Sequence, residues 1–350
     1  MYKNVTIVIP SYKPDEKLIS TVRGVREAGF SDIIVVDDGG GEKYAEYFRL
    51  VESEFGCTVL THEVNRGKGA ALKTAFAHYI ENRPNSVGLV TADADGQHLP
   101  ADMIAVADMM SKSQSVVLGC RDFSEAHVPP RSKLGNKTTS AVFKMFLGMN
   151  ISDTQTGLRG IPRKYVSVLG EADGDRYEYE THMLFLMQKK GIPFSEVKIS
   201  TVYIDENSSS HFRVIRDSMR IYELMIRFAV SSILCTAIDI YWLCFFTYAF
   251  ANIESGFVKF AAAALVARLI SAFLNFLVNN RAVFRSKLSV KAFGKYFLFA
   301  LPRAVAMALI VGLFAGTLDL AITATIILRS LLSLLLFATS FRLQFTKIFK

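Results

Sequence analysis

The stretch VGLVTADADGQHLP, residues 87–100, decides the fold. It starts as an apolar run typical of a buried strand and then reaches Asp93 and Asp95. Residues two apart in an extended chain face the same way, and Gln97 continues this register if the chain stays extended. Carboxylate and amide oxygens suit Mg²⁺ or Mn²⁺. The alternative is a capped turn, in which Asp95 or Gln97 caps a helix that begins near Pro100.

Three further apolar runs also end in polar or glycine residues, and helical patterns fill the gaps between the runs. The predicted strands are 5–10, 32–40, 87–95 and 115–122, and the predicted helices are 15–28, 42–55, 67–82 and 100–111. This alternation predicts a mostly parallel, Rossmann-like α/β sheet with helices on both faces. Ligands of such sheets bind beyond the carboxyl ends of the strands. The side chains expected there are Tyr12, Asp37, Asp38, Asp93, Asp95 and Arg121.

From Phe228 onward the composition is dominated by Phe, Leu, Ala, Ile and Val. A bilayer span takes about 20 apolar residues, and four segments are long enough: 228–250, 259–280, 296–316 and 320–341. The 281–295 loop and the C-terminal tail are basic, whereas ANIESG and GTLDLA carry acids and no base. Because positive residues stay inside, we expect a multi-pass plasma-membrane protein with both ends and this loop in the cytoplasm.

Three regions are therefore expected along the chain. They are a cytoplasmic domain at 1–209, an amphipathic interfacial linker helix at 210–227 and an all-α four-helix transmembrane domain at 228–350. The predicted spans contain Asp239, Arg268, Arg303 and Arg329. A charge at mid-bilayer costs ~2.5–3.5 kcal/mol on insertion scales, so it normally faces protein or water. A structural Asp239–Arg268 pair and a polar path for a phosphate-bearing lipid both remain open.

The charge and cysteine content narrow the class of protein. The formal net charge of +8 suits nucleic acid, anionic lipid or phosphorylated ligands. The sequence has no nucleic-acid motif and its basic residues lie largely beside apolar segments, so we expect lipid and phosphate partners and no nucleic acid. The four cysteines form no C-x-x-C pair, which argues against a disulfide framework and fits a reducing compartment.

Five segments carry a family resemblance: TIVIPSYKPDEKLI, IIVVDDGG, NRGKGAALKTAF, TADADGQHLPADM and SDTQTGLRGIPR. In this order they resemble the family 2 glycosyltransferases of GT-A fold. More narrowly, they resemble the polyprenyl-phosphate branch, which includes dolichol-phosphate mannose synthases and undecaprenyl-phosphate glucosyltransferases. The resemblance covers residues 5 to about 215. Later, RFAVSSILCTAID and ARLISAFLNFLVNNRAVF, with Arg303 and Arg329, resemble a GtrA-like four-span domain.

The resemblance implies roles for individual residues. The implied donor-binding set is Pro10, Tyr12, Asp37, Asp38, Lys68, Asp93, Asp95, Gln97, Gln155, His211 and Arg213. The implied catalytic set is Asp93, Asp95, Asp153, Arg121 and Arg131. Within these sets Asp93, Asp95 and Gln97 would hold the metal, and Arg121, Arg131 and Ser132 would receive the acceptor phosphate. Glu178 and Glu180 either face the sugar or serve as acids at a helix N-terminus.

The implied reaction transfers a hexose from a nucleotide-diphosphate sugar to polyprenyl (undecaprenyl) phosphate, with inversion, for cell-envelope glycosylation. A UDP-hexose is favoured by analogy with bacterial fusions of the two domains, and GDP-mannose remains open. A second hypothesis adds transport, in which the spans flip the lipid-linked sugar. A processive polysaccharide synthase is not expected, because the sole tryptophan, Trp242, lies inside a span and the Q-x-x-R-W motif is absent. Polar groups in the spans make a homo-oligomer an expectation.

Overall fold

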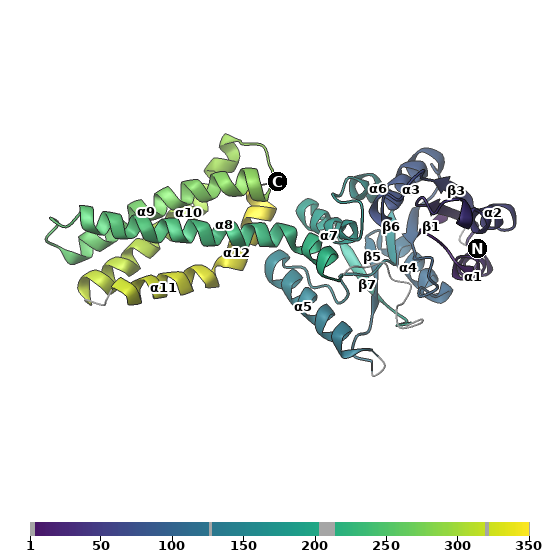
Figure 1. Cartoon of the computed structure of the whole chain (residues 1–350), viewed down its shortest axis with the longest axis horizontal. Coiled ribbons are helices and arrows are strands. Elements are labelled where there is room, and N and C mark those ends of the chain that lie inside the picture. The colour runs from purple at the N-terminus through teal and green to yellow at the C-terminus, as the bar shows by residue number, and fades with distance from the viewer. Residues whose placement is uncertain (1–3, 126–127, 203–213, 319–321, 350) are drawn as a thin grey trace. The chain divides into compact units, whose positions relative to one another are not determined.

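The chain divides into two compact units. The computed structural model describes residues 4–125, 128–202, 214–318 and 322–349. The first unit runs from Met1 to Ile221 and the second from Tyr222 to Lys350. Figure 1 shows the chain and labels most of the helices and strands.

A seven-stranded sheet forms the centre of the first unit, in the order β3-β2-β1-β4-β6-β5-β7. The strands are β1 (Val5–Ser11), β2 (Asp32–Asp37), β3 (Thr58–Thr61), β4 (Gly88–Thr91), β5 (Val116–Arg121), β6 (Arg159–Pro162) and β7 (Phe194–Ile199). β6 is antiparallel to β4 and β5, and the other strand pairs are parallel. The mostly parallel sheet expected from the sequence is confirmed.

Seven α-helices of the first unit connect and cover these strands. They are α1 (Glu16–Glu27), α2 (Ala45–Ser53), α3 (Lys68–Asn82), α4 (Pro100–Ser113), α5 (Pro130–Leu147), α6 (Arg163–Gly170) and α7 (Glu178–Lys190). The four predicted helices correspond to α1–α4. The hydrophobic pattern does not predict β3, β6 or β7, because β3 is partly exposed, β6 (RGIP) is not an apolar run and β7 alternates partly exposed positions.

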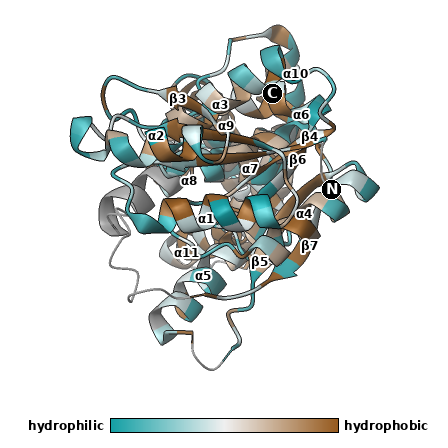
Figure 2. Cartoon of the chain, turned by 90° about the vertical axis from the view of Figure 1, so that its right-hand side faces the viewer, coloured by the Kyte–Doolittle hydropathy of each residue, from teal (hydrophilic) through white to brown (hydrophobic). Residues whose placement is uncertain are grey.

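A large apolar core lies between one face of the sheet and helices α1, α2 and α4. Ile7 and Ile9 of β1 pack there with Leu18 and Val22 of α1 and with Val106 of α4. Figure 2 shows the result, with largely hydrophobic strands and alternating hydrophobic and hydrophilic residues along α1. Because this core fixes the register of parallel strands, it also fixes which residues emerge at their carboxyl ends.

The second unit is built from apolar helices. They are α8 (Val214–Ala249), which begins before the unit boundary, α9 (Gly256–Val278), α10 (Val290–Val311), α11 (Ile322–Leu335) and α12 (Phe337–Leu343). By length and composition, three described segments are able to cross a membrane: Tyr222–Ala249, Gly256–Val283 and Val290–Thr317. The pair Thr323–Leu335 and Phe337–Ile348, bent by 45°, makes a fourth if it counts as one span. From Val214 onward, the expected linker helix and first span form one continuous helix.

Two glycines provide a matched test of this packing. A Cβ at Gly88 would lie 2.6 Å from the carbonyl oxygen of Ile161 on β6 and 2.7 Å from Sδ of Met110. Gly88→Ala should therefore lower the free energy of unfolding of the first unit by about 1–3 kcal/mol, as overpacked sites do. Gly135 of α5 has no described atom within 4 Å of a Cβ, so Gly135→Ala should raise that free energy by about 0.5–1 kcal/mol.

The measurement is urea-dependent hydrogen exchange of β1 and β4 peptides in the full chain. Equal midpoints for the two variants would contradict the packing of β4 against β6.

Candidate active site

Three segments meet through one half-buried lysine at the carboxyl edge of the sheet. Lys68 Nζ, at the start of α3, lies 2.6 Å from Asp93 Oδ1 and 2.9 Å from Glu180 Oε1. Burial disfavours the ammonium, but Asp93 and Glu180 outweigh burial and raise the pKa of Lys68 well above its ordinary value. Burial would raise the pKa of Asp93, but Lys68 and then His98 more than offset it, so that this pKa falls to about 2. Asp93 is therefore ionised at neutral pH.

Gly157 leaves room for this pair. A Cβ at Gly157 would lie 2.6 Å from Asp93 Oδ2 and 3.0 Å from Lys68 Nζ. Thr91 Oγ1 donates to the carbonyl oxygen of Gly157 at 2.7 Å, which ties the end of β4 to the segment before β6. The glycine in DTQTG thus lets the backbone pass directly beside the carboxylate.

Asp95 follows Asp93 in a turn rather than in an extended strand. β4 ends at Thr91, and Gly96 adopts a φ of +79°. Asp95 Oδ1 accepts a 3.0 Å bond from Gln97 N within this turn. The N-cap of α4 is Leu99, without a side-chain cap, so Asp95 and Gln97 do not cap that helix. Burial, reinforced by the charge of Asp93, raises the pKa of Asp95.

His98 is a neighbour of the two aspartates that the motif analysis missed. The Asp93 amide N–H donates to His98 Nδ1 at 2.9 Å, and His98 Nε2 lies 4.0 Å from Asp93 Oδ2. Burial lowers the pKa of His98 despite the nearby carboxylates, which favours a neutral ring. Because Nδ1 accepts a bond, the proton of the neutral ring lies on Nε2 and faces Asp93. In the sequence, only the position of His98 just after DADGQ indicates that it lies close to the two aspartates.

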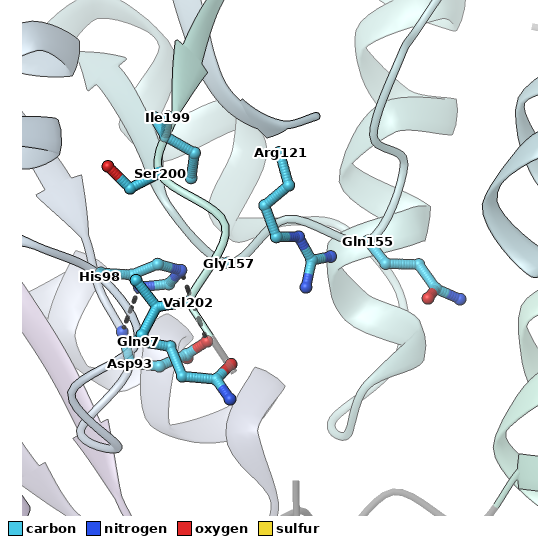
Figure 3. Close-up of a pocket in the computed structure, with 9 residues that line it drawn as sticks. All are labelled: Asp93, Gln97, His98, Arg121, Gln155, Gly157, Ile199, Ser200 and Val202. Atoms are coloured by element: carbon cyan, nitrogen blue, oxygen red, sulfur yellow. Dashed lines mark hydrogen bonds and ion pairs between the residues drawn. The ribbon is translucent and has the colours of Figure 1, made fainter. Parts of the chain in front are cut away.

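Arg121 is held across the same pocket by a buried carboxylate. Arg121 Nε lies 2.7 Å from Asp153 Oδ2, and its Nη2 donates to Asp153 Oδ1 at 3.2 Å. Asp153 is fully buried, and its Oδ1 also accepts from Gln155 N at 3.1 Å. In Figure 3, the Arg121 side chain lies between the Asp93–His98 group and Gln155. This bidentate pair sets the plane of the guanidinium.

Asp38 is buried beneath the loop that leads to Lys68. Its carboxylate accepts bonds from the backbone N–H groups of Arg66 and Gly67 at 2.9 and 2.8 Å. It also accepts from Asn65 Nδ2 at 2.8 Å and lies 2.8 Å from His62 Nδ1. These contacts place Asp38 as an organiser of the 65–67 loop, and its predicted contact with the donor remains a prediction.

The residues expected to line the nucleoside pocket lie at or just after the ends of β1 and β2. Asp37 is buried, and its Oδ1 accepts from Gly40 N at 2.8 Å. Burial raises the pKa of Asp37. Pro10 is buried in β1, and Tyr12 is half-buried just after it. The structure therefore gathers these three residues at neighbouring strand ends.

The remaining candidates are distributed over α5, α7 and the residues after β7. Ser132 is half-buried in the first turn of α5, which also contains Arg131. His211 and Arg213 lie outside the described residues. Glu178 Oε1 accepts from the backbone N–H groups of Asp175 and Arg176, both at 3.3 Å, which fits the helix-terminus alternative.

A second missed residue is Arg159, which the core of the unit almost completely encloses. Its Nη1 donates to the carbonyl oxygen of Glu180 at 2.7 Å, and its Nε donates to that of Thr156 at 3.0 Å. It thereby joins the start of α7 to the DTQTG segment. Nothing in the sequence around Arg159 indicates that this arginine is buried.

The oxygen atoms that Asp93 and Asp95 offer at this edge fit a divalent cation. Asp93 and Asp95 are close enough for their charges to repel, and a cation beside them would relieve that repulsion. Within the described part of the chain, no group of three or more His, Cys, Asp or Glu side chains could hold a metal ion. Substrate phosphate oxygens and water would have to complete the coordination, as is common for Mg²⁺.

The bonds of Asp38 generate a prediction. In Asp38→Asn, an amide N–H₂ group replaces one acceptor oxygen, so at least one backbone N–H of the 65–67 loop loses its partner. A buried donor without a partner costs about 1–3 kcal/mol, and the amides of residues 66 and 67 should exchange with deuterium at least roughly 10-fold faster. The control is Asp175→Asn, whose carboxylate is largely exposed. Unchanged exchange in Asp38→Asn would contradict this role.

Comparison with known proteins agrees with the motifs. Residues 6–170 match the family model described as Glycosyl transferase family 2. The UDP-N-acetylglucosamine–dolichyl-phosphate N-acetylglucosaminyltransferase of Methanococcus voltae is 27% identical over 58% of this chain and 87% of that protein. The polyprenol monophosphomannose synthase of Mycolicibacterium smegmatis is 28% identical over 55% and 76%, respectively.

Among solved structures, glucosyl-3-phosphoglycerate synthase of Mycobacterium tuberculosis aligns with a TM-score of 0.48 and 13% identity, over 64% of this chain and 76% of that one. The family match and the mixed, mostly parallel sheet with its flanking helices agree with each other. This chain is therefore a glycosyltransferase with an N-terminal unit of GT-A fold, and its residues 6–170 are similar to glycosyl transferase family 2.

Proposed function

We propose that the chain transfers a hexose from a nucleotide-diphosphate sugar to a polyprenyl phosphate at the cytoplasmic face of the plasma membrane. The observation that carries the proposal is that Asp93 and the guanidinium of Arg121 line the same pocket. An acidic side suits a cation-bound diphosphate, and a basic side suits a second phosphate. Relatives named for dolichyl-phosphate and polyprenol acceptors support this choice of acceptor.

The acceptor explains why the site needs no strong general base. The second pKa of a phosphate monoester is near ~6, so the acceptor is already an anion at neutral pH. Asp153, the nearest buried carboxylate to Arg121, is engaged by that guanidinium and by Gln155 N. We therefore assign Asp153 the role of orienting Arg121 rather than of accepting a proton.

The chain's own groups bring two anions together and align them. Arg121, with Arg131 and Ser132 in the expected acceptor set, would bind the incoming phosphate. Lys68 holds Asp93 in place, and this carboxylate with Asp95 and Gln97 would hold Mg²⁺ or Mn²⁺. When bound, the cation supplies Lewis-acid neutralisation of the departing diphosphate. Alignment in a restricted pocket supplies the remaining advantage.

The donor and the setting complete the proposal. Pro10, Tyr12 and Asp37 would line the nucleoside pocket, and Asp38 would shape the adjoining loop. A UDP-hexose is the favoured donor, with GDP-mannose as the competitor, and inversion at the anomeric carbon is expected. The apolar helices of the second unit support attachment to the bilayer in which the acceptor is dissolved.

The direct test is an assay of the purified full chain with undecaprenyl phosphate, Mg²⁺ or Mn²⁺, and labelled UDP-glucose, UDP-N-acetylglucosamine, UDP-galactose or GDP-mannose. Asp93→Asn and Asp95→Asn should each reduce kcat/KM about 10²- to 10³-fold, since a bound cation supplies several kcal/mol of charge stabilisation. A chelator should have a comparable effect on the unmodified protein. Glu171→Gln, at the exposed C-cap of α6, is the control. Full activity with a chelator, or without the lipid phosphate, would refute the proposal.

Lys68 provides a separate test of positioning. Lys68→Met removes the shared cation of Asp93 and Glu180, so kcat/KM should fall roughly 10- to 100-fold, as for other groups that orient metal ligands. Lys73→Met is the matched control, because Lys73 lies on the same helix and pairs with the largely exposed Asp175 at 2.9 Å. Equal activity of the two variants would show that Lys68 does not position Asp93.

A further inference from the structure

Each described helical span of the second unit contributes one charged side chain to a cluster in which Asp239 and Arg329 are buried and Arg268 and Arg303 are partly exposed. Asp239 of α8 lies 3.4 Å from Arg268 Nη1 of α9 and 2.5 Å from Arg329 Nη2 of α11. Arg303 of α10 is close enough to Arg268 for their positive charges to repel. We call Asp239, Arg268, Arg303 and Arg329 the span cluster. The Asp239–Arg268 pair expected from the sequence is thus part of a cluster that also includes Arg303 and Arg329.

The span cluster has a surplus of positive charge. It contains three guanidinium groups and one carboxylate, and Asp239 and Arg329 are only 1% and 3% exposed. Arg303 Nη1 donates to the neutral hydroxyl of Ser340 at 2.7 Å, which compensates no charge. Within the described spans, the other Asp, Glu, Lys and Arg residues lie toward the helix ends, so none of them offsets the surplus at this depth.

The buried members of the cluster also have unused hydrogen-bonding atoms. Among the described residues, Nε and Nη1 of Arg329 and Oδ1 of Asp239 have no hydrogen-bond partner. A guanidinium has five N–H donors, and leaving them unsatisfied in an apolar environment is unfavourable. The unpaired donors of Arg329 therefore point to a missing acceptor, whereas Asp239 Oδ1 would need a donor.

A neighbouring polar network shows the contrast. Asn279 Nδ2 donates to Asn275 Oδ1 at 2.9 Å and to Gln344 Oε1 at 2.8 Å. Ser231 and Tyr296 donate to the two asparagines at 2.7 and 2.9 Å. This network joins the helices with neutral pairs that satisfy one another. The span cluster, in the same unit, does not balance its own charge or its own donors.

The helices are irregular beside the cluster. Pro302, inside α10, directly precedes Arg303 and removes one backbone hydrogen bond of that helix. The break between α11 and α12 falls at Leu336, four residues before Ser340, with a bend of 45°. Irregular backbone at membrane depth is tolerated where it is buried in protein or lines a polar space.

We propose that the span cluster binds a phosphate anion, as the headgroup of a phosphate-bearing lipid or as a free ion. This site belongs to the second unit and is separate from the pocket around Asp93. Arginine's planar fork matches phosphate oxygens in a bidentate manner, and an anion would offset both the surplus charge and the unpaired donors. Asp239 keeps Arg268 and Arg329 in place, but its negative charge opposes the anion.

The test uses the full chain in detergent and native mass spectrometry to count bound lipids. The probes are undecaprenyl phosphate and phosphatidic acid, with undecaprenol as the neutral control, and a parallel arm uses inorganic phosphate. Arg303→Gln and Arg329→Gln should weaken binding at this site roughly 10-fold or more, because each removes a charge-assisted contact. Asp239→Asn should tighten it. Lys291→Gln, at the exposed start of α10, should change nothing.

The expected result is two phosphate lipids on the unmodified chain and one on Arg303→Gln, with undecaprenol absent. Binding of inorganic phosphate that depends on Arg303 also supports the site and identifies a free ion as its source. The same lipid and phosphate binding in all arginine variants, or weaker binding in Asp239→Asn, would overturn the proposal. Arg303 is partly exposed and should tolerate substitution if Arg329→Gln fails to fold. Glycosyl transfer by Arg303→Gln, measured separately, should be unchanged, so failure of either proposal is distinguishable.

Discussion

The contact of Lys68 with Asp93 and Glu180 is the interaction on which the active edge of the first unit depends. It joins the start of α3, the segment after β4 and the first turn of α7. Without this cation, two carboxylates would face each other in a largely buried place. The contact keeps Asp93 ionised and close to Asp95. A divalent cation bound there would relieve the repulsion between the two carboxylates.

Buried carboxylates position cations and backbone groups throughout this edge. Asp38 holds the loop before Lys68, Asp153 orients Arg121, and Glu178 binds the amides before α7. These contacts are made inside the protein and shape the site. The groups that line the pocket, including Asp93, Gln97 and Arg121, are thereby held in fixed positions. In the proposed reaction, such preorganisation would lower the reorganisation needed when two phosphates approach.

The sequence alone was sufficient for the features that depend on local pattern. Strand–helix alternation placed β1, β2, β4 and β5 with α1–α4, because each strand is an apolar run and each helix has a 3.6-residue period. It also located the polar residues at the strand ends and the apolar second half. The sequence pattern did not predict the short strands β3 and β6, since their pairing depends on neighbours distant in the chain.

Partner choice among the polar residues was decided only by the tertiary structure. The sequence placed Asp93 and Arg121 at one edge of the sheet, and the family resemblance implied site roles for Lys68 and Asp153, but the pairings among them were open. The order of the strands brought Arg121 to Asp153 and Lys68 to Asp93, and helix packing placed Arg329 beside Asp239. The physical reason is that ion pairs and buried hydrogen bonds act over a few ångströms. Periodicity determines which face a residue occupies, and only the folded chain determines what that residue meets there.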